Sequence, residues 1–150
     1  MHPVNITIYA MKKIFAIAAM AAGIFALSSC SQKVDVAGDW TVTEVDGSSL
    51  PELFEGQETP FISFNAADGR LHGNTGVNVI NSTYTQDGKN LEIGMAASTM
   101  MAGPEEWMQT ERQIIDALGS TRTVKAVDKN TVELCDSTGK AVLTLEKRQK

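Results

Sequence analysis

Cysteine and histidine are scarce in this chain, which has two of each among its 150 residues. Two cysteines form at most one disulfide, so the sequence is not that of a disulfide-rich secreted scaffold. His72 is the only histidine after residue 30, and no second histidine or cysteine accompanies it at ligand spacing. Zinc sites are built from such groups, so we predict no metal and no other cofactor.

Positive charge is also in short supply. With 13 Lys and Arg residues against 18 Asp and Glu, the chain carries a net charge of −5. If an N-terminal leader containing Lys12 and Lys13 is removed, 11 basic residues face 18 acidic ones, a net charge of −7. Nucleic-acid phosphates are bound by Lys and Arg. An acidic chain of this kind is therefore not expected to bind nucleic acid.

Long hydrophobic runs are absent except for one, which covers residues 14–27 and follows Lys12 and Lys13. Fourteen apolar residues are too few for a comfortable transmembrane helix. A positive start, a short apolar run and then small residues are typical of a secretory signal. We predict that residues 1–29 are the signal segment. Residues 1–10 contain no Lys or Arg, so Met11 is the better candidate for the true start.

Cys30 follows this leader directly, after Leu27, Ser28 and Ser29, as in a bacterial lipoprotein signal. We predict that Cys30 becomes the first mature residue and carries acyl chains such as palmitate, with residues 30–36 as a tether. Each buried methylene contributes roughly 0.8 kcal/mol, and two or more chains anchor a protein stably. We expect an exported envelope protein, at the outer rather than the inner membrane. The alternative is ordinary cleavage that leaves a soluble secreted protein.

Cys135 is left without a disulfide partner if Cys30 is acylated. A lone thiol in an exported protein is usually buried and inert. The alternating run 131–135 places Cys135 on the same strand face as Glu133, which leaves its burial open.

The remaining 121 residues read as short strands separated by turn signals such as Asp-Gly, with one helix. Such turns join antiparallel neighbours. The segment 47–59 has no periodicity and is predicted to be a loop. The predicted strands cover residues 40–45, 60–64, 70–72, 77–85, 89–95, 121–127, 131–135 and 140–146.

The helix is predicted between Gly103 and Gly119. Pro104 and two acidic residues stand at its start, where the helix dipole favours them, and Gly119 is the expected stop. Apolar spacing marks one buried face, made of Trp107, Glu111, Ile114, Ile115 and Leu118. The fold class is therefore α+β, with a strongly twisted, barrel-like antiparallel sheet of about eight strands and one covering helix.

Three short motifs occur in order along this predicted domain, which covers residues 37–147. They are Gly38 with Trp40; Gly73, Gly76 and Asn78 with Tyr84 downstream; and Thr99 through Gly103 with Glu111 on the helix that follows. Together they resemble the META domain, or HslJ-like, family.

In this resemblance, Val77 and Gly103 replace two cysteines of the family motifs. The loss of both predicts that the two positions meet in space, so that the turn 76–78 lies against the start of the helix. It also excludes a redox role for those positions. The resemblance implies a non-catalytic protein. The family is associated with bacterial stress response and drug tolerance, and with secretion or virulence in some parasites, and many bacterial members are envelope proteins.

Glu111 is the most unusual residue of the helix, because a carboxylate on an apolar face must be paired or hydrogen-bonded. One interpretation is a general base or ligand anchor. The other, which we favour, is a structural acceptor for backbone amides of the turn 73–78. The glycines Gly73 and Gly76 are expected to supply positive φ in a tight bend, and Asn78 to bridge the same turn.

Four methionines, Met95, Met100, Met101 and Met108, lie before and within the helix. Methionine fills irregular core gaps and also lines adaptable binding surfaces. We favour core packing, with an apolar ligand or partner surface as the alternative. The aromatic residues predicted to lie in the core are Trp40, Phe61, Phe64, Tyr84 and Trp107.

Three functional hypotheses remain. The first is a non-enzymatic, membrane-anchored protein that binds an envelope partner or acts as a scaffold in stress response. The second is a small apolar-ligand-binding protein with a barrel-like cavity. The third is a hydrolase, which we rank last because no serine stands in a Gly-x-Ser-x-Gly context, and we predict no catalytic residues. An exposed apolar patch over a filled core favours the first hypothesis, and a large apolar cavity favours the second.

Overall fold

The computed structural model describes residues 33–149. The predicted signal segment, its start at Met11 and the acylation site at Cys30 lie outside these residues. The described part contains ten strands and one helix. Their bounds are β1 Gly38–Val45, β2 Ser48–Ser49, β3 Phe61–Asn65, β4 Arg70–Asn74, β5 Val79–Asp87, β6 Asn90–Ile93, β7 Ala97–Ser98, α1 Glu105–Ser120, β8 Thr123–Ala126, β9 Thr131–Cys135 and β10 Ala141–Lys147.

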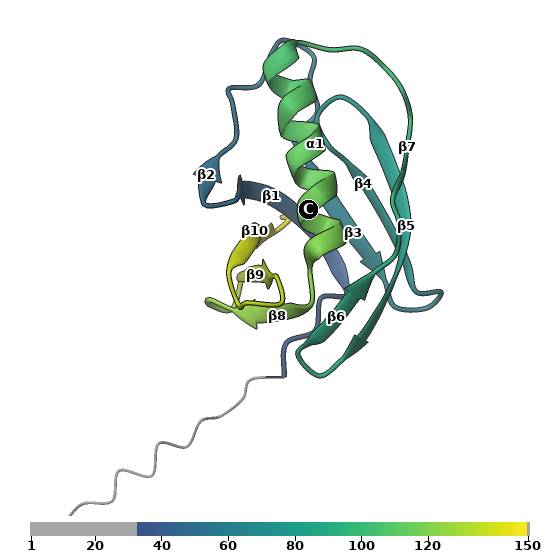
Figure 1. Cartoon of the computed structure of the whole chain (residues 1–150), viewed down its shortest axis with the longest axis vertical. Coiled ribbons are helices and arrows are strands. Elements are labelled where there is room, and N and C mark those ends of the chain that lie inside the picture. The colour runs from purple at the N-terminus through teal and green to yellow at the C-terminus, as the bar shows by residue number, and fades with distance from the viewer. Residues whose placement is uncertain (1–32, 150) are drawn as a thin grey trace, which may run out of the picture. The chain divides into compact units, whose positions relative to one another are not determined.

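The strands form one antiparallel sheet in the order β10-β9-β8-β6-β5-β4-β3-β1-β2, and β10 also pairs with β1 (Figure 1). Eight of the described strands therefore follow one another in a ring. This confirms the predicted α+β class with a barrel-like antiparallel sheet. The short strands β2, which pairs with β1, and β7, which pairs with β5, were not predicted. A strand of two residues has no sequence period to detect.

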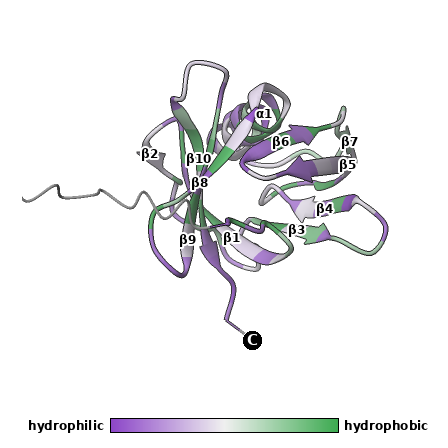
Figure 2. Cartoon of the chain, turned by 90° about the horizontal axis from the view of Figure 1, so that it is seen from below, coloured by the Kyte–Doolittle hydropathy of each residue, from purple (hydrophilic) through white to green (hydrophobic). Residues whose placement is uncertain are grey.

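The ring is weakest between β6 and β8, which share one registered pair, Asn90 with Thr123. By contrast, β1 and β10 share five registered pairs, with a bulge between Val42 and Glu44. The helix α1 lies across the ring and contacts β1 and β10. Figure 2 looks along the ring, with β8, β9 and β10 on one side, β3, β4 and β5 on the other, and α1 between them.

The core lies inside the ring, because residues alternate between the two faces of each strand. Trp40 is buried, and its indole N–H donates to the carbonyl of Val36 at 2.7 Å. Phe64 and Tyr84 meet edge to face, with ring centroids 4.9 Å apart. Phe61 was wrongly assigned to the core. It is only half-buried on the outer face, since its neighbour Ile62 takes the inward position.

The helix begins after Pro104 and buries Trp107, Glu111, Ile114 and Leu118, as predicted. Ile115, which was predicted on the same face, is only half-buried. Its predicted end at Gly119 was wrong. The helix continues to Ser120 and ends at Thr121, whose N–H donates to the carbonyl of Leu118. The buried hydroxyl of Thr121 also donates to the carbonyl of Ala117 at 2.8 Å. A side chain thus closes the helix where a glycine was expected.

Cys135 is buried and free of a disulfide. Cys135 of β9 pairs with Ala141 of β10, and the next registered pair is Leu134 with Leu143. One residue of β10, Val142, is therefore left unpaired in a bulge. The bulge lies in β10, where Val142 and Leu143 are both buried. Cys135 is buried but, unlike Leu134, is not part of the hydrophobic core inside the ring. Burial, and then the negative charge of Glu133, raise the pKa of the Cys135 thiol. A raised pKa lowers the fraction of thiolate, which is the nucleophilic form of cysteine.

Candidate functional site

The turn between β4 and β5, residues 75–78, is the centre of a buried polar cluster. Gly76 adopts a φ of +97°, a conformation that other residues rarely take. A Cβ at Gly76 would lie 2.8 Å from the Trp107 ring and 2.6 Å from the side-chain nitrogen of Gln57. The turn, the helix and the loop before β3 are thus packed together at this glycine.

Gly73 behaves differently from the prediction. Its φ is not positive, so the expectation of a positive-φ bend there was wrong. A Cβ at this position would instead lie 2.6 Å from the carbonyl oxygen of Phe61 on the neighbouring strand. Close approach between β3 and β4, and not an unusual backbone angle, is what requires glycine here.

Glu111 reaches the turn from the helix, one turn after Trp107, and its residue is only 7% exposed. The hydroxyl of Thr75 donates to its Oε2 at 2.6 Å. The amide of Asn78 donates to Oε1 at 3.0 Å and to Oε2 at 2.9 Å. The structural role predicted for Glu111 agrees with these contacts, but the donors are side chains of the turn where we expected backbone amides.

Asn78 connects three segments. Its amide nitrogen also donates to the carbonyl of Met101 at 3.1 Å, and its Oδ1 accepts from the Met101 N–H at 2.7 Å and the Thr99 hydroxyl at 2.8 Å. A backbone N–H can only donate, so the contact with Met101 sets the orientation of the amide. Within residues 33–149, every buried side-chain nitrogen or oxygen atom has a hydrogen-bond partner. The cluster is therefore a fully satisfied network.

The predicted contact between Val77 and Gly103 is confirmed. A Cβ at Gly103 would lie 3.0 Å from both γ-carbons of Val77. The turn lies against the residues that precede α1, as the paired loss of the two motif cysteines indicated.

The methionines were wrongly predicted to pack in the core. Met95 is 97% exposed, Met100 98% and Met101 65%, while Met108 on the helix is half-buried. After Ile93 the chain is unpaired until β7 pairs with β5, and it then runs to the start of α1 (Figure 1). Asn78 bonds the backbone of Met101, and the Met101 side chain points outward.

Two further exposed apolar residues lie on the other side of the helix start. They are Leu53 and Phe54, which are 48% and 41% exposed. Their loop is attached there because the Trp107 indole N–H donates to the carbonyl of Glu52 at 3.1 Å. We call Leu53, Phe54, Met100 and Met101 the apolar rim. Sequence reasoning did not find its first two members, because the loop 47–59 has no period.

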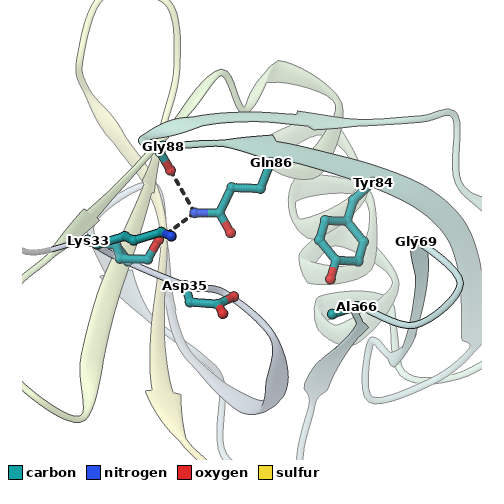
Figure 3. Close-up of a pocket in the computed structure, with 8 residues that line it drawn as sticks. Lys33, Asp35, Ala66, Gly69, Tyr84, Gln86 and Gly88 are labelled. Carbon is teal, nitrogen blue, oxygen red and sulfur yellow. Dashed lines mark hydrogen bonds between the residues drawn. The ribbon is translucent and has the colours of Figure 1, made fainter.

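The opposite end of the domain receives the chain from residue 33. There the Gln86 amide donates to the carbonyl of Val34 at 2.6 Å, and its oxygen accepts from the Val36 N–H at 3.1 Å. A hollow of about 290 Å³ lies beside these residues, with Tyr84 and Asp35 on its wall (Figure 3). Burial, and then the charges of Asp35 and Asp68, raise the pKa of the Tyr84 hydroxyl.

His72 lies away from the Glu111 cluster. It is exposed on the outer face of β4, where its Nδ1 is 3.1 Å from the side-chain oxygen of Asn81. These residues line an open groove of about 770 Å³ whose walls also include Arg70 and Asp39. In the described part of the chain, no three His, Cys, Asp or Glu residues are placed to hold a metal ion.

Each remaining motif residue has a structural position. Gly38 begins β1 with a φ of +120°. Thr99 pairs with Val79 through its N–H and also receives the Val79 N–H at its hydroxyl. The helix of residues 33–149, α1, does not combine the length and the apolar character that a membrane-crossing helix needs.

Comparisons with known proteins identify the class. The family model for the META domain matches residues 33–149. The chain therefore belongs to the META domain family. No curated protein matches it.

Three solved structures share the fold. A protein from Burkholderia xenovorans, solved by NMR, is 23% identical, with a TM-score of 0.58 over 80% of this chain and 87% of that one. A DUF4847 family protein from Bacteroides vulgatus, a crystal structure, is 16% identical, with a TM-score of 0.53 over 77% and 95%. Another NMR structure is 19% identical, with a TM-score of 0.56 over 74% and 89%.

Proposed function

We propose that this META domain is a membrane-anchored envelope protein that acts in stress response by binding a protein partner, without catalysing a reaction. The observation that carries the proposal is the apolar rim. Large apolar side chains are normally exposed singly, whereas here four of them flank the start of one helix. Exposed apolar patches of this kind are typical of protein interaction sites.

The position of the rim suits a protein anchored through Cys30. The chain reaches the domain at Lys33, beside the β5–β6 hairpin, whereas the rim surrounds the other end of α1 (Figure 1). An acyl anchor three residues before Lys33 would therefore hold the first end toward the membrane. The rim would then face away from the lipid and be free for a partner.

The contacts of Glu111 and His72 support a non-enzymatic role. A general base needs a free oxygen within reach of a substrate. Both oxygens of Glu111 accept hydrogen bonds from Asn78, and one also accepts from Thr75. His72 lies on the outer face of β4, while Glu111 is inside, so the two do not converge. The apolar-ligand alternative has less support, because the hollows described above are open and none is lined by the methionines.

The interaction is tested by photo-crosslinking in cells. A photoreactive phenylalanine is placed at Met100 in one strain and at Thr85, an exposed residue of β5, in another. We expect a discrete protein adduct from position 100 and none from position 85. Equal patterns from both positions, or no adduct at position 100, would overturn the proposed role.

The anchor is tested separately. Metabolic labelling with a palmitate analogue should mark the parent protein and leave the Cys30→Ser variant unmarked. The parent should sediment with outer-membrane fractions. Labelling that persists in the variant would refute acylation at Cys30, and sedimentation with the inner membrane would correct the predicted location.

A further inference from the structure

We infer that the partner segment that docks on the apolar rim is a cationic amphipathic helix, with one apolar and one basic face. This inference rests on the proposed function and specifies the chemistry of the partner. Exposed methionines suit such an occupant, because an unbranched side chain with three rotatable bonds adapts to differently shaped apolar faces.

The charges around the rim supply the complementarity. Glu52 and Glu55 are exposed and flank Leu53 and Phe54 in sequence, and Glu105 and Glu106 are exposed in the first turn of α1. No Lys or Arg occurs in residues 46–69 or 90–111, the two segments that form the rim.

These four carboxylates also lack internal partners. The ion pairs within residues 33–149 are Lys125 with Glu133, Lys140 with Asp46, and Arg148 with Glu58. None of them involves Glu52, Glu55, Glu105 or Glu106; the carboxylates of the segment 46–69 that are paired are Asp46 and Glu58. An apolar surface bordered by free negative charge attracts a basic partner and repels an acidic one.

The same charges argue against a lipid surface as the occupant. Membrane headgroups are often anionic and attract basic segments, whereas this rim is acidic. The rim also lies at the opposite end of the described domain from Lys33, the first described residue after the predicted anchor at Cys30 (Figure 1). A basic helix of a protein or peptide fits both observations.

Methionine-methyl NMR tests the inference on the acylated protein in phosphatidylcholine nanodiscs. The probe is a synthetic peptide of leucine and lysine in a helical amphipathic pattern, about 18 residues or five turns long. We expect the methyl signals of Met100 and Met101 to shift on titration. The signal of Met95 is the internal control, because it is equally exposed but lies outside the rim.

Two pairs of charge variants separate local from general attraction. Glu105→Gln with Glu106→Gln should weaken peptide binding about tenfold, which corresponds to about 1.4 kcal/mol. Asp87→Asn with Glu92→Gln removes the same charge from exposed positions near the β5–β6 hairpin and should leave the affinity unchanged. Met100→Gln with Met101→Gln should also weaken binding, without loss of folded structure.

Three results would overturn the inference: no binding, equal binding of a peptide with every lysine replaced by glutamine, or shifts that include Met95 equally. If the cells still give an adduct at position 100 in that event, the proposed partner role stands and only its basic chemistry is wrong. If the adduct is absent while the peptide binds, the proposed function fails and the peptide affinity remains a property of the isolated rim.

Discussion

At the scale of single residues, the buried cluster shows why one sequence position can require one side chain. Glu111 accepts hydrogen bonds from Thr75 and Asn78, and Asn78 in turn holds the backbone of Met101. Thr75 and Asn78 are 0% and 1% exposed, so their polar groups cannot bond water instead. Removal of one member therefore leaves buried polar atoms without partners, which costs more than the hydrogen bond alone contributes.

Glu111→Ala should lower the free energy of unfolding by about 1–3 kcal/mol, because the buried Thr75 hydroxyl and Asn78 amide lose their acceptor. Urea denaturation measures the change. Gln113→Ala, an exposed position on the same helix, is the control and should change stability by less than about 0.5 kcal/mol. Equal denaturation midpoints for Glu111→Ala and the parent would refute the structural role.

Gly76→Ala should destabilise the domain more than Gly139→Ala. Both glycines have positive φ, +97° and +85°, so both substitutions bear the backbone cost of about 1–2 kcal/mol. A Cβ at Gly139 meets nothing within 4 Å, whereas one at Gly76 meets Trp107 at 2.8 Å. Overpacking adds about 1–3 kcal/mol at Gly76. Equal shifts in melting temperature would show that Trp107 moves aside freely.

At the scale of elements, the start of α1 is held by contacts that no local pattern of the helix specifies. Val77 touches Gly103, Trp107 binds the loop at Glu52, and Asn78 binds the segment before the helix. These contacts join three segments that are distant in sequence: the loop at Glu52, the turn at residues 77–78 and the start of the helix with the residues before it. The long connection between β7 and α1 keeps one course because of them.

The double variant Val77→Cys with Gly103→Cys should form a disulfide. A Cβ at Gly103 would lie 3.6 Å from that of Val77, within the usual range for a disulfide. Closing this loop should stabilise the domain by about 2–4 kcal/mol under oxidising conditions. Melting temperatures with and without reductant measure the gain, and Val77→Cys alone is the control. Two free thiols at these positions after oxidation would contradict the contact.

The hairpin between β9 and β10 should weaken in acid. Asp136 accepts hydrogen bonds from the Thr138 hydroxyl and N–H and from the Lys140 N–H, which lower its pKa from 3.8. Because the folded pKa is lower than the unfolded one, this contribution is present above pH 3.8 and is lost as the pH falls through the folded pKa. An NMR titration should place the Asp136 carboxyl below 3.8. A value at or above 3.8 would exclude the contribution.

At the scale of the whole molecule, the ring has one weak joint. β6 and β8 are held by one registered pair and by the bonds from Leu91 N–H to Arg122 and from Val124 N–H to Lys89. The five registered pairs of β1 and β10 close the ring elsewhere. Local opening starts where few bonds must break together.

Hydrogen exchange should therefore be faster at the amides of Leu91 and Val124 than at the central amides of β1 and β10. Leu91 is fully buried, so if burial alone controlled exchange, its amide would exchange slowly. Fast exchange at Leu91 would instead point to local opening between β6 and β8. NMR exchange rates under native conditions measure it. Equal protection across both joints would show that the ring opens only as a unit.

The sequence by itself determined the fold class, the eight main strands and the buried face of α1, and its resemblance to the META domain family added the contact of Val77 with Gly103. Alternating apolar residues, helical spacing and turn residues depend on neighbours along the chain, so they can be read from the sequence without a structure. The acylation site, the partner and the membrane remain predictions. They lie outside the residues that the structure describes, or concern other molecules.

Only the tertiary structure decided which apolar residues are inside. Met95, Met100 and Met101 are apolar, but they stand on either side of the short strand β7 and are exposed, and Asn78 holds the backbone at Met101. Leu53 and Phe54 belong to a loop whose place is set by Trp107. A bulge in β10 buries both Val142 and Leu143, which alternation along the strand does not predict. In each case the deciding contact joins distant residues, and its energy depends on a geometry that no local pattern contains.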